Sequence, residues 1–274
     1  MTSTLLETCK VSAPKSFPEP PAAPSPHEPA PITCTRIDFA AFNLPEYVDR
    51  YALVIDNLFT REDCAHLLSC VPTTEPWPGA PVEEIITDKS YRNSGKITRE
   101  DPDLCSWVLA KVSPYLQEIN TIDASMHKRL RRARVRHPQL QVDLGLGSTA
   151  TISRLRGLQF LRYGPGHFFK RHGDGTHISD DEKEISYYTM QIYLNGDSTT
   201  PRGGATRFWP NPRLRKGSQA GGDAYVDVEP RMGRILVFEQ GDLIHSGEEV
   251  TAGIKYNIRT DILYSEDAPA SSVA

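Results

Sequence analysis

The chain has 274 residues, of which 38% are hydrophobic and 24% are charged, an ordinary composition for a soluble globular protein. Its net charge of −4 gives the whole molecule no bias toward nucleic acid or an anionic membrane. No stretch has the apolar length of a membrane span, and the N-terminus shows no secretory signal. We therefore expect a cytoplasmic protein without nucleic-acid or membrane partners, and the composition leaves its oligomeric state open.

The cysteines also indicate a reducing compartment. Their odd number and their scatter fit free thiols better than a disulfide framework, and they form no metal motif. They are Cys9, Cys34, Cys64, Cys70 and Cys105.

The first segment, residues 1–35, is rich in proline and is expected to be a disordered tail. Such a composition buries too little apolar surface to offset the entropy of ordering the chain. A polyproline ligand for a partner domain and an arm packed along the enzyme are the two alternatives. Residues 267–274 are expected to form a short disordered tail at the other end.

Residues 36–150 are predicted to supply helical support for the following domain. A strand and two helices are expected, at residues 51–56, at 60–71 and from 101 onward. Thr60 and Asp63 stand in the positions of a capping box at a helix N-terminus. Pro102 suits the first turn of the second helix, and Pro114 should kink or end it.

A strongly basic run, Met126–His137, follows these helices. Basic runs can bind phosphate backbones, but this one lacks interleaved aromatic residues for base stacking. We interpret it as a solvated helix face or a mobile loop, and it could also attract an anionic substrate.

From residue 158 onward, short strands alternate with glycine, proline, aspartate and asparagine turns, which is typical of a sandwich or barrel. The expected strands cover residues 158–163, 186–194, 205–209, 224–228, 234–238 and 254–264.

Within this region, His172 and Asp174 stand two residues apart, after an aromatic run. In an extended strand such residues point to the same face, so an imidazole and a carboxylate can meet one metal ion. His245 follows an apolar strand far along the chain, and Lys255 comes ten residues later. Two histidines and one carboxylate make the facial triad of non-haem iron oxygenases, which leaves three iron positions open.

With these motifs, the chain from about residue 50 to residue 264 resembles the prolyl-4-hydroxylase-like branch of the Fe(II)/2-oxoglutarate dioxygenases. The matching elements are Tyr163…His172-x-Asp174, Tyr193-Leu194-Asn195, Gly203-Gly204-Ala205-Thr206-x-Phe208 and His245…Lys255. The resemblance implies an α+β fold, with a double-stranded β-helix (jelly-roll) core at residues 151–266 supported by N-terminal helices.

The resemblance also implies the roles of the site residues. His172, Asp174 and His245 would hold Fe(II), and Lys255 would pair with the far carboxylate of 2-oxoglutarate. Arg259 is the alternative partner, because it faces the same side of the strand and binds carboxylates in a bidentate manner. Three further residues match positions beside the cosubstrate: Tyr163, Tyr193 and Thr206. For both tyrosines, core packing with a satisfied hydroxyl is the alternative.

The other histidines, His127, His137, His167 and His177, are expected to have structural or surface roles. Arg92, Asn93 and Gln191 are candidate substrate contacts, and a solvated turn is the alternative for the stretch around Arg92 and Asn93.

The implied activity is hydroxylation of an unactivated C–H bond, with consumption of O2 and release of succinate and CO2. Ascorbate is a further candidate cofactor, and desaturation or ring formation stays open as an outcome. Asp174 disfavours halogenation, since family halogenases lack this carboxylate. The first choice of substrate is a small molecule or an amino acid. The alternatives are an intracellular protein or peptidyl-prolyl hydroxylase, and a catalytically silent metal-binding or sensing protein.

Overall fold

The computed structural model describes residues 16, 30–72, 77, 89–123, 149–196, 201–215 and 224–266. The basic run, the C-terminal tail and most of the proline-rich segment therefore lie outside the described residues. Of that segment, Ser16 forms an isolated parallel bridge with Asp227.

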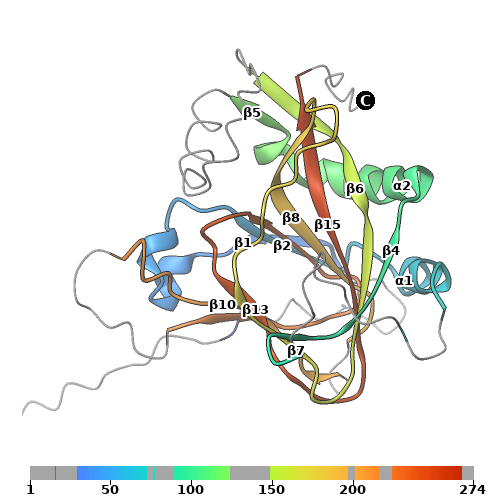
Figure 1. Cartoon of the computed structure of the whole chain (residues 1–274), viewed down its shortest axis with the longest axis vertical. Coiled ribbons are helices and arrows are strands. Elements are labelled where there is room, and N and C mark those ends of the chain that lie inside the picture. The colour runs from blue at the N-terminus through green and yellow to red at the C-terminus, as the bar shows by residue number, and fades with distance from the viewer. Residues whose placement is uncertain are drawn as a thin grey trace, which may run out of the picture.

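The larger layer is a sheet of eight antiparallel strands (Figure 1). Its strands are β1 (Thr33–Arg36), β2 (Ala52–Asp56), β4 (Gly95–Arg99), β5 (Thr121–Asp123), β6 (Thr149–Tyr163), β8 (Ile185–Tyr193), β12 (Ile235–Glu239) and β15 (Lys255–Ser265). Their order is β1-β2-β12-β8-β15-β6-β4, and β5 pairs with the start of β6.

The second layer is a sheet of five strands. These are β3 (Arg92–Asn93), β7 (Phe168–His172), β10 (Thr206–Phe208), β11 (Val226–Val228) and β13 (His245–Gly247), in the order β11-β10-β13-β7-β3. A small ribbon pairs β9 (Arg202–Gly203) with β14 (Val250–Ala252). The two sheets form a double-stranded β-helix, so the predicted jelly-roll architecture is confirmed.

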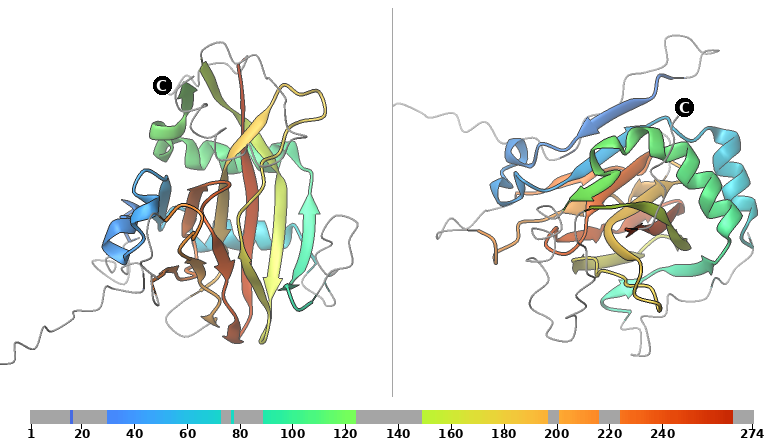
Figure 2. Two further views of the ribbon diagram at one scale, coloured as in Figure 1. Left: turned by 60° about the vertical axis from the view of Figure 1, so that its left-hand side comes forward. Right: turned by 90° about the horizontal axis from the view of Figure 1, so that it is seen from above.

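Helices α1 (Arg61–Ser69) and α2 (Pro102–Val112) cover the outer side of the large sheet (Figure 2). The described residues also form four 3-10 helices: η1 (Phe39–Phe42), η2 (Pro45–Tyr47), η3 (Ser113–Tyr115) and η4 (Gln117–Ile119). The capping box of α1 is present, with the side chains of Thr60 and Asp63 each accepting the other's backbone N–H. In the described ranges, no helix is long and apolar enough to span a membrane.

The region expected to be helical support contributes strands as well. Residues 33–35, expected in the tail, belong to β1, which pairs with β2 through Cys34 and Ile55. The physical reason is that β2 is buried along its whole length and would otherwise present an open edge. Likewise, β6 begins at Thr149 rather than near residue 158, because the long partner strand β15 continues to pair with it.

The two faces of the large sheet differ in chemistry. On β8, Met190 and Ile192 point into the apolar core beneath the helices, while Thr189 and Gln191 occupy the opposite face. Strand β15 alternates in the same way. Burying polar groups costs free energy unless they find partners. The polar side chains on the inner face of β8 and β15 therefore indicate a binding site rather than a packed core.

Candidate active site

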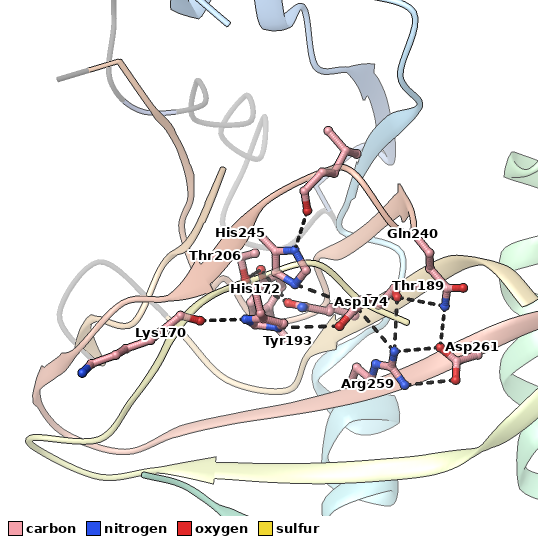
Figure 3. A network of polar contacts seen from close by, with 12 residues as sticks. Lys170, His172, Asp174, Thr189, Tyr193, Thr206, Gln240, His245, Arg259 and Asp261 are labelled. Carbon is pink, nitrogen blue, oxygen red and sulfur yellow. Dashed lines mark hydrogen bonds and ion pairs between the residues drawn. The ribbon is translucent and has the colours of Figure 1, made fainter. Parts of the chain in front are cut away.

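His172, Asp174 and His245 converge between the two sheets (Figure 3). His172 ends β7 and lies directly opposite His245, the first residue of the neighbouring strand β13. The pairing register of β13 with β7 shifts between His245 and Gly247, and such irregularities commonly change the direction of a side chain. Asp174 lies just beyond β7, where its backbone carbonyl accepts a hydrogen bond from the Gly241 N–H at 2.9 Å.

Both imidazoles are fixed in one tautomer by backbone carbonyls. Nδ1 of His172 lies 2.7 Å from the Lys170 carbonyl oxygen, and Nδ1 of His245 lies 3.0 Å from that of Leu243. A carbonyl can only accept, so each Nδ1 carries the proton and donates it. Each Nε2 then keeps a free lone pair for a metal ion, an arrangement common among metal-binding histidines.

Aromatic packing holds the two rings in place. Phe169 stacks on the His172 ring at a centroid distance of 3.7 Å, and Phe238 meets the His245 ring edge-on at 4.7 Å. These contacts restrict the rotation of both imidazoles, so the donor atoms are preorganised.

The electrostatics of the triad favour a neutral imidazole and an ionised carboxylate. Burial lowers the pKa of His245 to about 4, and the neighbouring His172 adds to the effect. Burial by itself would raise the pKa of Asp174, but Arg259 and the two histidines outweigh it and hold that pKa well below its usual value. These are the protonation states in which both groups bind metals.

The distances between the donor atoms fit a single metal ion. Nε2 of His172 lies 3.6 Å from Oδ1 of Asp174, and Nε2 of His245 lies 3.8 Å from Oδ2. The three ligand atoms all lie within 4.8 Å of one another. A set of two imidazoles and one carboxylate suits a metal such as Fe(II). His127 and His137 lie outside the described residues.

A cavity of about 190 Å³ opens beside the triad. The triad lines it together with six of the other predicted site residues: Arg92, Tyr163, Gln191, Thr206, Lys255 and Arg259. Tyr193 reaches it through Thr206, and Asn93 is not among the lining residues. The structure therefore brings most of the predicted site residues to one cavity.

Lys255 is a buried cation in the wall of this cavity. It is 3% exposed, and its Nζ donates to the neutral carbonyl oxygen of Gly204 at 2.6 Å. Burial lowers the pKa of Lys255 to about 8, which Glu229 partly opposes. The ring centroids of Tyr163 and Tyr193 lie 5.1 and 5.4 Å from Nζ. A buried ammonium in this setting is suited to receive an anion.

A chain of hydroxyl and amide groups lies next to Lys255. The Tyr193 hydroxyl is 2.7 Å from Oγ1 of Thr206, which in turn donates to Oε1 of Gln191 at 2.9 Å. Burial raises the pKa of the Tyr193 hydroxyl, so this group stays protonated and can donate. Gln191, expected as a substrate contact, here also orders the groups around Lys255.

Arg259 already has partners for its positive charge. Its Nη1 donates to Oδ2 of Asp261 at 3.0 Å, and its Nη2 lies 2.8 Å from the other oxygen of that carboxylate. The same Nη2 lies 3.5 Å from Oδ2 of Asp174. Arg259 is therefore directed at the carboxylate of the triad, whereas Lys255 faces a neutral carbonyl.

Arg92 and Asn93 form the short strand β3 beside β7. The guanidinium of Arg92 lies over the Phe169 ring at 4.5 Å, and its Nε donates to Oγ of Ser94 at 3.0 Å. Asn93 pairs with Phe168. Arg92 thus stands at the wall of the cavity, held by an aromatic ring that also packs on a triad histidine.

Sequence reasoning missed three residues near the triad. Thr189 donates to Asp174, and Asp261 binds Arg259. Gln240 donates to both Thr189 and Asp261. Thr189 lies two residues before Gln191, and Asp261 two residues after Arg259, so strand alternation was a usable signal for both. Gln240 follows the end of β12, and no periodicity marks it.

Comparison with known proteins agrees with this geometry. Residues 158–260 match the model of the 2OG-Fe(II) oxygenase superfamily. A search of curated proteins finds no match.

Many solved structures are similar to the chain, and among them are three prolyl hydroxylases. A viral collagen prolyl hydroxylase from Paramecium Bursaria Chlorella virus-1, in complex with 2OG, has 17% identity and a TM-score of 0.43, covering 78% of this chain and 96% of that one. A Pseudomonas putida prolyl-4-hydroxylase has 16% identity and a TM-score of 0.47, with 82% and 97% covered. A prolyl hydroxylase from Trichoplax adhaerens, in complex with a hypoxia inducible factor oxygen degradation domain peptide fragment, has 16% identity and a TM-score of 0.46, with 86% and 94% covered.

The matched residues extend from within β6 to within β15 and include all three members of the triad. The region that carries the triad is therefore similar to the 2OG-Fe(II) oxygenase superfamily, and this match supports a dioxygenase.

Proposed function

We propose that the protein uses Fe(II) and 2-oxoglutarate to hydroxylate an unactivated C–H bond of a small molecule or an amino acid. In the balanced reaction, substrate R–H, 2-oxoglutarate and O2 give R–OH, succinate and CO2. The observation that carries the proposal is one cavity lined both by the His172, Asp174 and His245 donor atoms and by the buried Lys255.

The residues present fit both groups. Two Nε2 lone pairs and one carboxylate suit Fe(II), and a buried ammonium suits the far carboxylate of 2-oxoglutarate, which must be paired when it leaves water. Bound Fe(II) with 2-oxoglutarate supplies O2 activation. In this account Lys255 anchors the cosubstrate, while Tyr163, Tyr193 and Thr206 surround that anchor.

A second candidate is hydroxylation of a peptide, and a groove outside the cavity favours it. This groove of about 430 Å³ shares Phe169, Ser246 and Gly247 with the cavity. It is lined further by the aromatic residues Tyr91, Phe168 and Trp209. Aromatic-lined grooves suit extended, proline-containing segments.

Succinate release tests the proposal. The purified protein, Fe(II) and 2-oxoglutarate would be incubated with pools of small molecules, of amino acids and of proline-containing peptides. We expect a small-molecule or amino-acid pool to increase succinate formation above the rate without substrate. An increase with peptides alone would select the second candidate. No succinate with any pool, in a protein that binds the metal, would favour the silent sensing protein.

A groove variant separates the two enzyme candidates further. Tyr91 is 40% exposed, so Tyr91→Ala should leave the fold intact and weaken only a substrate that occupies the groove. Val48→Ala, at an apolar residue that is 67% exposed, is the matched control. If the substrate is a small molecule held in the cavity, both variants keep the wild-type apparent affinity for it. If the substrate is a peptide in the groove, only Tyr91→Ala weakens that affinity.

A further inference from the structure

Two donors contact Oδ2 of the Asp174 carboxylate (Figure 3). Oγ1 of Thr189 donates to Oδ2 at 2.6 Å, and the Arg259 guanidinium lies 3.5 Å from the same atom. Thr189 is fully buried on β8, so its hydroxyl has few alternative positions. Oδ1, by contrast, faces the Nε2 of His172.

The two donors are themselves held by a buried network. Asp261 binds the Arg259 guanidinium through both of its carboxylate oxygens. Nε2 of Gln240 donates to Oδ1 of Asp261 at 2.7 Å and lies 3.3 Å from Oγ1 of Thr189. The Ser186 hydroxyl fixes the other end of the Gln240 amide, at 2.9 Å. The network thus joins β8, β15 and the end of β12 behind one triad carboxylate.

The carboxylate lies close enough to the histidines for either oxygen to bind a metal. Oδ1 is the atom near His172, and Oδ2 is the atom near His245, at 3.6 and 3.8 Å. Their surroundings, rather than their distances, decide which oxygen is used. An oxygen that accepts a short hydrogen bond and faces a guanidinium has less electron density to offer.

We propose that Thr189 and Arg259 are positioning residues that keep Oδ2 of Asp174 off the metal, so that the carboxylate binds through Oδ1 alone. This inference rests on the proposed metal site and adds a role for the buried network. A bidentate carboxylate would occupy one of the three positions that a facial triad leaves open. 2-Oxoglutarate would need two of these three positions. A bidentate carboxylate would therefore take the one position left for O2.

Counting metal-bound water tests the inference without turnover. Mn(II) would be added to the full-length protein in ¹⁷O-enriched water, and pulsed electron paramagnetic resonance would give the number of coordinated waters. We expect three waters in the wild type and two in Thr189→Val, because the freed Oδ2 then binds the metal. Thr189→Ser keeps the hydroxyl and should restore three. Substrate-dependent succinate release should fall about 10- to 100-fold in Thr189→Val.

Two further comparisons make the result specific. Thr260→Val is the matched control, since Thr260 is equally buried on β15 but its hydroxyl donates to the Arg156 carbonyl at 3.0 Å. It should keep three waters. If Thr189→Val does not fold, Arg259→Met replaces it as the test variant, and two waters are expected. Arg259→Lys keeps the positive charge and should keep three waters.

Three waters in both Thr189→Val and Arg259→Met would overturn the inference, and so would two waters in the wild type. In either case the proposed function would stand, because Mn(II) is bound. A wild-type protein that binds no Mn(II) would overturn the proposed function and this inference together.

Discussion

At the scale of single residues, the site depends on charges placed where water is largely excluded. Lys255 and Arg259 both face the cavity from β15, yet their surroundings differ. Arg259 is compensated by Asp174 and Asp261, whereas Lys255 donates to a backbone carbonyl. An arriving dianion would gain most from the cation whose charge is less compensated. The structure therefore supports Lys255 over Arg259 as the cosubstrate anchor, and both assignments stay predictions.

Replacing Lys255 should damage cosubstrate binding selectively. In Lys255→Met the far carboxylate is left without its cation, which costs on the order of 3–5 kcal/mol. This corresponds to about two to four decades in affinity. A 2-oxoglutarate titration at saturating substrate should show that Lys255→Met raises the apparent 2-oxoglutarate requirement by this factor. Arg259→Met should raise it much less. The reverse ranking would move the anchor to Arg259.

Cosubstrate affinity should also depend on pH. The pKa of Lys255 is lowered to about 8, so the ammonium is present below that pH and is lost as the pH rises through it. Calorimetric titration should therefore show weaker 2-oxoglutarate binding at pH 9 than at pH 7. Lys255→Arg keeps its charge over this range and should show a flat profile, whatever its absolute affinity. An equally flat wild-type profile would exclude Lys255 as the titrating anchor.

At the scale of elements, the triad depends on how the end of β7 packs against the turn before β13. Gly173, between His172 at the end of β7 and Asp174 just beyond it, has no room for a side chain, because an added Cβ would lie 2.1 Å from the carbonyl oxygen of Gly241. The same Gly241 donates its N–H to Asp174. Backbone contact at this point, and not only side-chain chemistry, places the carboxylate.

Substitution of Gly173 tests this packing. In Gly173→Ala the backbone must shift away from Gly241, at a cost of about 1–3 kcal/mol in stability. Asp174 should move with it, and metal affinity should fall roughly tenfold or more. Gly175→Ala is the matched control, since an added Cβ there meets nothing within 4 Å. Metal titration and thermal unfolding of both variants give the comparison. Equal metal affinities in the two variants would show that this contact does not place Asp174.

At the scale of the whole molecule, strand spacing predicted a sandwich or barrel, and the resemblance carried by the motifs implied the jelly-roll and most of the cavity residues. His172, His245 and Lys255 carry chemistry that is recognisable without coordinates. The network behind Asp174 was not predicted, because it depends on the registers of β8, β12 and β15. The strand β1 was missed because Thr33–Arg36 has no apolar alternation and forms only as an edge for β2.

The pairing of β1 gives a prediction for truncation. A chain starting at Ala30 keeps β1 and the hydrogen bond from Nδ2 of Asn57 to the Pro31 carbonyl, at 2.8 Å. We expect it to retain wild-type activity, although it loses the bridge between Ser16 and Asp227. A chain starting at Ile37 exposes the edge of β2 and should unfold at a lower temperature or aggregate. A folded but inactive chain from Ala30 would show that the proline-rich segment contributes to the site.

The central claim is that His172, Asp174 and His245 hold the metal on which 2-oxoglutarate binding depends. Anaerobic calorimetry tests it most directly, by titrating Fe(II) and then 2-oxoglutarate into the wild type and into His172→Ala and His245→Ala. We predict one Fe(II) per wild-type chain, followed by one 2-oxoglutarate, and loss of both in the folded histidine variants. Fe(II) binding of wild-type affinity in either variant, or equally tight 2-oxoglutarate binding without metal, would contradict the account.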